Sequence, residues 1–278
     1  MKKIAIIGSG FGGLSAGIRL RAAGYDVTIF EKNTHVGGHA YPLAKNGYLF
    51  DMGPSLITAP EVIEEIFNAA GKKLSDYLEL IPLDPFYRIY YHDKSYIDYV
   101  ADGERMKAQM AAFNPKDAEQ YDRFMEASKK IYKAVMVEKL GAMPFDSWSA
   151  MLGFAPRALG MGALKSSYQF ASGFFKDFRH RVIKGGMTSL VKAFRNLYEE
   201  IGGKVLTDSP VRRILVENGR AAGVQVGEMR YPADAVISNA DFIHTYRDLL
   251  PESSRKKWSN RRLERVSYGM SAFLLYLG

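Results

Sequence analysis

Hydrophobic residues near the start of the chain follow the pattern of a strand, a helix and a second strand. The run Ile4–Ile7 is wholly apolar, as in a parallel strand that is covered on both faces. Apolar residues then recur at helical spacing from Leu14 to Ala23, and Gly24 ends the pattern. A second apolar run, Val27–Phe30, leads directly to Glu31. This order predicts a β-α-β unit of a Rossmann-like α/β fold.

The turn after the first strand is rich in glycine. Gly8 allows a tight turn, Gly10 lets the main chain approach a pyrophosphate, and Gly13 lets the helix pack close to the strand. The unpaired N–H groups at the helix N-terminus favour an anion there. Glu31, 18 residues after Gly13, stands where a carboxylate accepts hydrogen bonds from the two hydroxyls of an adenosine ribose. A plain glycine-rich turn is the alternative. Because the first strand, the helix, the second strand and the acidic residue at its end all occur in register, we predict a dinucleotide site.

The middle of the chain has a different period. Between Pro60 and Arg181 apolar residues recur every three or four positions, which predicts a helical region. The expected helices are Glu61–Ala70, Glu104–Phe113 and Ala118–Leu140. This region predicts an inserted, mainly helical domain.

The last third alternates again. Val205–Val226 alternates apolar and polar residues around Asn218-Gly219, which predicts a β-meander. Asp234–Ser238 is expected to return to the main sheet beside the first strand. The nucleotide-binding domain is then discontinuous, with residues 1–80 and 184–270, and residues 81–183 form the inserted domain. Residues 271–278 are expected to start a strand of that inserted domain.

Composition removes several classes of function. The 278 residues are 47% hydrophobic and carry a net charge of +8, which is typical of a globular protein with a real core. The absence of cysteine excludes disulfides, thiolate metal sites and a cysteine nucleophile. The five histidines lack metal-ligand spacing, so no metal site is expected. No apolar run reaches the roughly 20 residues that span a bilayer, and Met1-Lys2-Lys3 leads straight into a strand, so we expect a cytoplasmic protein without a signal peptide.

Further motifs continue along almost the whole chain. They are Gly8-x-Gly10-x-x-Gly13-x-x-Ala16, Glu31, Gly37-Gly38, Phe50-Asp51-x-Gly53-Pro54, Asp84-Pro85-Phe86-Tyr87-Arg88, Phe113-Asn114-Pro115, Gly185-Gly186-Met187-Thr188-Ser189-Leu190, Val211–Ile214 and Ser238-Asn239-Ala240-Asp241. With these motifs the chain resembles the FAD-dependent amine-oxidase-like flavoproteins and, within them, the bacterial-type phytoene desaturases. The resemblance implies FAD as the cofactor.

The resemblance also implies which residues bind FAD. They are Gly8, Gly10, Phe11, Gly12, Gly13, Glu31, Lys32, Gly37, Gly38, His39, Gly53, Pro54, Ser55 and Val211. His39 stands where relatives usually have Arg or Lys, and is either a phosphate contact or a turn histidine. Gly53-Pro54-Ser55 passes close to the isoalloxazine ring in the family, or is a surface turn here. By resemblance, the backbone of Val211 contacts the adenine.

The implied activity is the desaturation of an acyclic carotene such as phytoene, in carotenoid biosynthesis. The chain shows no paired carboxylates, G-x-S-x-G or Walker loop, so no catalytic residue is assigned and the cofactor carries the chemistry. Two alternatives stay open. One is a non-catalytic dinucleotide- or carotenoid-binding module at a membrane surface, and the other is an amine-oxidase-like flavoenzyme that acts on an amine or another isoprenoid.

Two segments suggest contact with a membrane surface. Ala142–Phe178 is dense in methionine and aromatic residues, with Lys and Arg interleaved, and is either a membrane-docking surface or the core of the inserted domain. Arg255–Arg265 holds six cations against Glu264 and faces either anionic lipid or solvent. No nucleic-acid-binding motif accompanies it, so no nucleic-acid partner is expected. We therefore expect a peripheral membrane protein, and the sequence indicates no oligomeric state.

The chain departs from the family pattern in two places. Arg181–Gly186 joins two motifs that relatives separate with a substantial segment, and the family's C-terminal portion has no counterpart here. The substrate-domain sheet is therefore expected to be incomplete. Either these residues are part of a longer chain, or the protein is a reduced form of the family.

Overall fold

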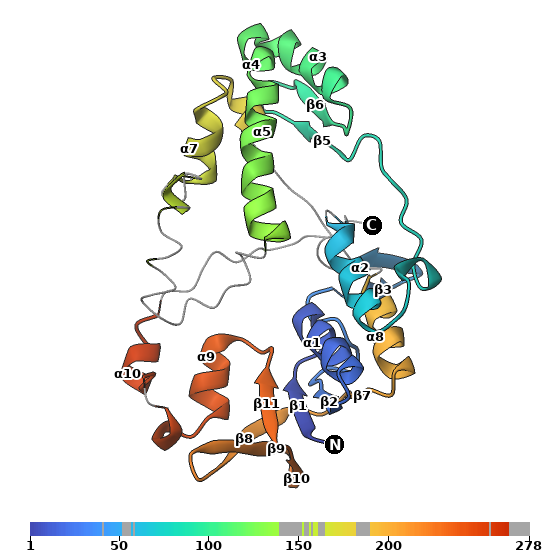
Figure 1. Cartoon of the computed structure of the whole chain (residues 1–278), viewed down its shortest axis with the longest axis vertical. Coiled ribbons are helices and arrows are strands. Elements are labelled where there is room, and N and C mark those ends of the chain that lie inside the picture. The colour runs from blue at the N-terminus through green and yellow to red at the C-terminus, as the bar shows by residue number, and fades with distance from the viewer. Residues whose placement is uncertain are drawn as a thin grey trace. The chain divides into compact units, whose positions relative to one another are not determined.

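The computed structural model describes residues 1–40, 42–51, 57, 59–138, 152, 156, 158–160, 165–181, 190–255 and 257–266 (Figure 1). The chain divides into two compact units. Unit 1 comprises Met1–Leu80 and Gly185–Gly278, and unit 2 comprises Ile81–Lys184. The expected strand at 271–278 and the segment Gly53-Pro54-Ser55 lie outside the described residues, as does most of the range 142–164.

Unit 1 is built on a parallel sheet of four strands. The order is β11 (Ala235–Ser238), β1 (Lys3–Ile7), β2 (Asp26–Phe30) and β7 (Lys204–Leu206). In Figure 1 the blue β1 and the orange β11 lie side by side, although more than 200 residues separate them in the chain. The predicted β-α-β unit and the return of the chain beside the first strand are confirmed.

Strand β7 corrects one expectation. We expected Val205 to begin the meander, but Lys204–Leu206 pairs in parallel with β2 instead. The pairing continues past the strand, because the Glu31 backbone N–H donates to the Leu206 carbonyl at 2.8 Å. Three residues are too short to carry a period, so the sequence pattern did not separate this strand from the one that follows.

Helices cover one face of this sheet. Helix α1 (Phe11–Ala22) packs on α8 (Leu190–Glu200) and α2 (Pro60–Ala69), and a short 3-10 turn η1 (Leu74–Asp76) follows α2. Tyr198 on α8 is fully buried, and its hydroxyl donates to the Val27 carbonyl at 2.7 Å. Its ring lies against Gly17, where a Cβ would be 2.8 Å from the ring. Since a side chain at position 17 would push α8 off the sheet, glycine sets this helix spacing.

The other face carries the predicted meander. Strands β8 (Val211–Glu217), β9 (Arg220–Val226) and β10 (Met229–Pro232) are antiparallel in the order β10-β9-β8. Asn218 and Gly219 both have positive φ, 50° and 76°, as the Asn-Gly hairpin turn requires, so the predicted turn is confirmed. Phe30 packs edge-on against Tyr231 of β10, with ring centroids 4.9 Å apart.

The remaining elements of unit 1 are short. A hairpin of β3 (Pro42–Lys45) and β4 (Tyr48–Asp51) follows the first β-α-β unit. Near the end of the described chain lie α9 (Phe242–His244), the π-helical turn η5 (Thr245–Leu249), the 3-10 turn η6 (Glu252–Ser254) and α10 (Asn260–Leu263).

Unit 2 is mainly helical, with α3 (Gly103–Phe113), α4 (Pro115–Glu119), α5 (Tyr121–Tyr132), η2 (Lys133–Val137), α7 (Ser167–Ser172) and η4 (Phe178–Arg181). Asp102 caps α3, and Asn114 with Pro115 starts α4. The expected helix Ala118–Leu140 is wrong at its start, because α4 ends at Glu119 and α5 begins at Tyr121. No helix among the described residues is long and apolar enough to cross a bilayer.

The helical expectation for unit 2 is also wrong over one hairpin. Strands β5 (Tyr87–Tyr90) and β6 (Tyr96–Tyr99) pair antiparallel. Tyr87 stacks on Tyr99 across the pair, with centroids 4.9 Å apart. Cross-strand aromatic pairs of this kind stabilise a hairpin through contacts that no single-segment period reveals.

Candidate functional site

The glycine turn of unit 1 lies at the carboxyl end of β1, where the order of the strands in the sheet reverses. From β1 the chain continues through α1 to β2 on one side, while β11 flanks β1 on the other. In sheets of this kind, ligands bind at the switch point, outside the carboxyl ends of the strands. We call this position, bordered by Gly8–Gly13, Glu31, Gly37-Gly38 and Asn239, the crevice of unit 1. Two backbone hydrogen bonds of 2.8 Å shape its floor, from Gly8 N–H to the Phe30 carbonyl and from Asn239 N–H to the Ile7 carbonyl.

Two glycines of this turn, Gly12 and Gly13, have no room for a side chain. A Cβ on Gly13 would collide with the Gly8 carbonyl oxygen, and one on Gly12 would collide with the Asn239 side chain. Gly8 itself has φ of 92°, in the region that only glycine adopts readily. These positions agree with the tight turn predicted at Gly8 and the close helix packing predicted at Gly13, while the approach of a pyrophosphate to Gly10 stays a prediction.

The pair Gly37-Gly38 lies against the glycine turn that follows β1. The Gly37 N–H donates to the Ser9 carbonyl at 3.0 Å, and a Cβ on Gly38 would lie 3.2 Å from the Gly10 Cα. Gly38 has φ of 63°. The structure thus brings into direct contact two glycine segments that the resemblance assigns to FAD binding.

The N-terminus of α1 is free of side-chain caps. Gly10 is the N-cap residue, no side chain in the described part of the chain caps the helix, and the first turn holds no acidic residue. The N-terminal end of a helix carries roughly half a positive charge. An anion at this helix end would therefore meet unpaired donors and a favourable dipole.

Glu31 lies at the end of β2 and is 4% exposed. Its Oε2 accepts from the Ser9 N–H at 2.9 Å and from the Ser9 hydroxyl at 2.6 Å, and its Oε1 accepts from the Asn33 N–H at 3.0 Å. A carboxylate offers about four lone-pair positions. One position, on Oε1, is therefore left for a ligand hydroxyl, one fewer than the sequence analysis assigned to Glu31.

Val211 begins β8, and a backbone hydrogen bond just before it holds this strand beside Glu31. The Ser209 N–H donates to the Glu31 carbonyl at 2.8 Å, which fixes the start of β8 beside the end of β2. Val211 itself is partly buried and packs against the core beneath the meander. The role of the Val211 backbone at the adenine stays a prediction.

Other expected residues take different places. Phe11 is partly buried and meets Phe194 edge-on, with centroids 5.9 Å apart, so its ring serves the core. Lys32 and His39 are both exposed.

One residue of this crevice was missed. Asn239 directly follows β11, and its carboxamide lies against Gly10 and Gly12. The motif Ser238-Asn239-Ala240-Asp241 carried the resemblance, yet only the parallel pairing of β11 with β1 brings Asn239 to the glycine turn.

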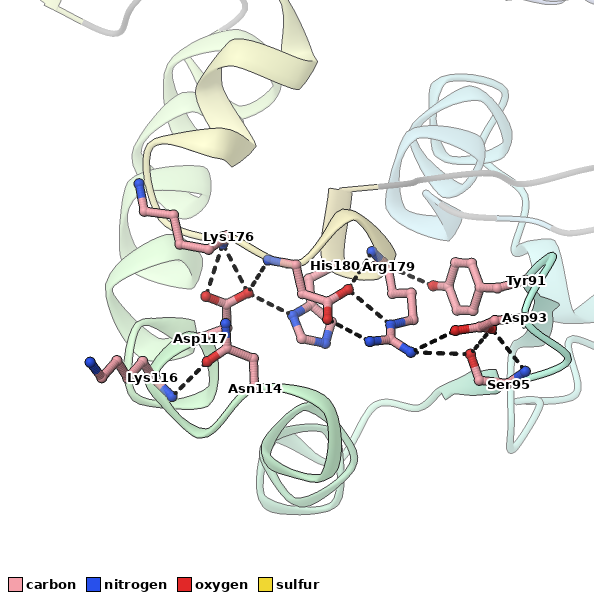
Figure 2. Close-up of polar contacts among 10 residues, drawn as sticks. Tyr91, Asp93, Ser95, Asn114, Lys116, Asp117, Lys176, Arg179 and His180 are labelled. Atoms are coloured by element: carbon pink, nitrogen blue, oxygen red, sulfur yellow. Dashed lines mark hydrogen bonds and ion pairs between the residues drawn. The ribbon is translucent and has the colours of Figure 1, made fainter.

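Unit 2 contains a separate polar cluster around a buried carboxylate, Asp117 (Figure 2). Asp117 accepts from the backbone N–H of Lys176 at 2.9 Å and of Asp177 at 2.8 Å, and from Nδ1 of His180 at 3.0 Å. Burial favours the neutral acid, but these hydrogen bonds outweigh it and hold the pKa of Asp117 below its ordinary value. Nε2 of His180 is buried and has no hydrogen-bond partner among the residues that the structure describes.

Arg179 extends this cluster toward the β5–β6 hairpin, as Figure 2 shows. Its guanidinium binds Asp177 at 2.7 and 2.9 Å and Asp93 at 3.0 Å. The hydrogen bonds from Arg179 lower the pKa of Asp177 to about 2. The Tyr91 hydroxyl donates to the Arg179 carbonyl at 2.5 Å. The cluster connects α4, the segment from Lys176 to His180 and the β5–β6 hairpin, and its role is structural. We call it the clamp around Arg179. In the described part of the chain, no three His, Asp or Glu side chains gather as a metal site.

The crevice of unit 1 fits the adenosine diphosphate half of a dinucleotide. An uncapped helix end and two facing glycine segments suit a diphosphate, and Glu31 offers an acceptor for a ribose hydroxyl. These groups all come from the first β-α-β unit and the glycine pair that follows it.

Comparison with known proteins agrees with this geometry. A family model described as "Flavin containing amine oxidoreductase" matches residues 11–274. The lycopene-forming phytoene desaturase of Pantoea ananas is 33% identical over 313 residues, an alignment that covers 100% of this chain and 63% of that protein. The zeta-carotene-forming phytoene desaturase of Myxococcus xanthus is 30% identical and is covered to 60%. The chain thus spans less than two thirds of these relatives.

Solved structures support the fold. The PF1083 protein of Pyrococcus furiosus superposes with a TM-score of 0.55 at 18% identity, over 96% of this chain and 66% of that one. A fatty acid isomerase from P. acnes that produces CLA gives a TM-score of 0.52 at 19% identity, over 92% of this chain and 63% of that one. At this identity the likeness concerns the fold alone.

Proposed function

We propose, since this chain belongs to the family of flavin containing amine oxidoreductases, that it takes part in the FAD-dependent desaturation of an acyclic carotene such as phytoene. Unit 1 is the FAD-binding domain in this proposal and unit 2 the substrate domain. The single observation that carries it is the crevice of unit 1, where an uncapped helix end, two glycine segments and Glu31 converge.

The residues of unit 1 have distinct tasks in this proposal. The backbone N–H groups from Gly10 to Gly13 and of Gly38 bind the diphosphate, while the Gly37 N–H donates to the Ser9 carbonyl, and Oε1 of Glu31 accepts a ribose hydroxyl. The backbone of Val211 borders the adenine. When bound, FAD supplies the two-electron acceptor for the hydride that desaturation removes. The protein orients the cofactor and keeps water from it.

Unit 2 contains a cavity of about 550 Å³ between α5 and α7. Its lining combines the apolar side chains of Ala127, Ile131, Phe170 and Phe174 with the charged side chains of Asp122, Arg123, Glu126 and Lys130. A carotene has no polar handle, so burial of its hydrocarbon surface against the apolar side chains supplies the binding free energy in this proposal. Because the lining also carries two carboxylates, the activity assay decides between a carotene and an amine.

We also propose that the protein binds the cytoplasmic surface of a membrane peripherally. Helix α5 and η2 expose the apolar side chains of Met125, Tyr132, Val135 and Val137 beside Lys129, Lys130 and Lys133. Apolar side chains set among lysines are typical of segments that lie in the interface of an anionic bilayer. Co-sedimentation with anionic and neutral vesicles tests this point, and equal absence from both pellets contradicts it.

The activity is tested with purified protein, FAD and phytoene in liposomes. The expected result is an extracted product with a longer conjugated chain, detected by its visible absorption. Protein that binds FAD but leaves phytoene unchanged would support the non-catalytic module instead. Protein that oxidises amines under the same conditions would support an amine-oxidase-like enzyme.

A further inference from the structure

Asn239 lies beside the glycine turn of unit 1, and neither the fold nor the proposed FAD contacts assign it a role. It follows β11 directly, and its backbone N–H donates to the Ile7 carbonyl at 2.8 Å. This bond fixes the residue at the switch point, between the ends of β1 and β11. The side chain is thereby set over the turn rather than over the core.

The carboxamide of Asn239 faces the glycine turn closely. A Cβ on Gly10 would lie 3.1 Å from Asn239 Nδ2, and a Cβ on Gly12 would collide with Asn239 Oδ1. A substituent on Gly10 would occupy the space in which a pyrophosphate approaches the backbone. Nδ2 therefore lies at the edge of the proposed diphosphate position.

The Asn239 side chain is uncommitted. It is exposed, and within the described part of the chain it makes no hydrogen bond. Ser9, the other polar side chain of the turn, donates its hydroxyl to Glu31 at 2.6 Å and is fully buried. Asn239 is thus the side-chain donor that this turn keeps free for a ligand.

We propose that Asn239 is a diphosphate-binding residue, whose Nδ2 donates a hydrogen bond to a phosphate oxygen of FAD. A neutral amide adds a directed donor to the N–H groups of the turn and the end of α1, and it brings no charge that would compete for Glu31. The inference rests on the proposed function, because it concerns the same cofactor site.

The experiment compares ADP with adenosine, which share every group except the phosphates. Calorimetry gives the ADP affinity and ligand-observed NMR gives the adenosine affinity, for the wild type, Asn239→Ala and Asn239→Asp. Asn218→Asp is the matched control, because it adds the same charge in unit 1 at a hairpin turn that accepts Asp-Gly. Adenosine affinity also reports whether each variant is folded.

The expected result is a loss that depends on the phosphates. Asn239→Ala weakens ADP binding about 10-fold, as for a hydrogen bond to a charged group, and Asn239→Asp weakens it roughly 100-fold because the new carboxylate repels the phosphates. Adenosine affinity stays the same in both variants, and Asn218→Asp binds both ligands as the wild type does.

Two results would overturn the inference while the wild type still binds ADP. One is unchanged ADP affinity in both Asn239 variants, and the other is an equal loss of ADP and adenosine affinity, which indicates a structural role. A wild type that binds neither ADP nor FAD would overturn the proposed function and this inference together.

Discussion

The substitution Glu31→Gln tests how much Glu31 contributes to the stability of the fold, separately from its contact with a ligand. Glu31 is nearly fully buried and accepts three hydrogen bonds, two from Ser9 and one from Asn33. Glutamine has the same shape, but one of its two terminal atoms is an NH₂ group that only donates. Whichever way the amide turns, at least one buried N–H of these neighbours faces another donor.

The magnitude follows from that count. Leaving one buried donor without an acceptor costs about 1 to 3 kcal/mol, so the free energy of unfolding should fall by that amount without any nucleotide. Ser9→Ala serves as the comparison, because it removes one hydroxyl donor and leaves Glu31 charged. That variant should lose about 1 kcal/mol, the ordinary net value of one hydrogen bond.

Urea unfolding followed by circular dichroism measures both variants, first without nucleotide and then with ADP. Bound ADP should raise the unfolding midpoint of the wild type and raise that of Glu31→Gln less, because the stability that a ligand adds to the folded state grows with the logarithm of its affinity. If Glu31→Gln unfolds at the wild-type midpoint without nucleotide, the reasoning about its three buried donors is refuted.

Three further predictions follow from the same structure. Gly13→Ala should abolish ADP binding in a titration, because its Cβ would collide with the Gly8 carbonyl oxygen and displace the turn, and wild-type affinity would contradict this. Tyr198→Phe should lower the free energy of unfolding by about 1 kcal/mol, because it leaves a buried strand carbonyl without its donor, whereas an unchanged value would contradict the packing described. The pKa of Asp177 falls from 3.8 to about 2 on folding, so its contribution of about 2 kcal/mol is present above pH 5 and is lost as the pH falls toward 2. Asp177→Asn should flatten unit 2's stability over that range in acid unfolding, and an unchanged pH profile would contradict the clamp around Arg179.

The sequence predicted the parts of the fold that local patterns encode. The strands β1 and β2 are short apolar runs bounded by glycine and charge, and the turn at Asn218-Gly219 follows from two residues that adopt positive φ. The return of Asp234–Ser238 to the sheet beside β1 was also predicted, in line with the family resemblance.

Other features depend on contacts between distant segments. The β5–β6 hairpin arises from tyrosines that pair across two strands, and β7 is recognisable only from its pairing with β2. At the site, the sequence identified Glu31 and the glycines, but not that Ser9 and Asn33 already fill most of the acceptor positions of Glu31. Asn239 was missed for the same reason, since parallel pairing alone brings it to the turn.

The central claim is that the crevice of unit 1 binds the adenylate half of FAD. A calorimetric titration of the purified protein with FAD, repeated in the presence of excess ADP, tests it most directly. The account predicts a single FAD per chain, displaced by ADP and lost in the Gly13→Ala variant. FAD that does not bind, or that binds without competition from ADP, would contradict it.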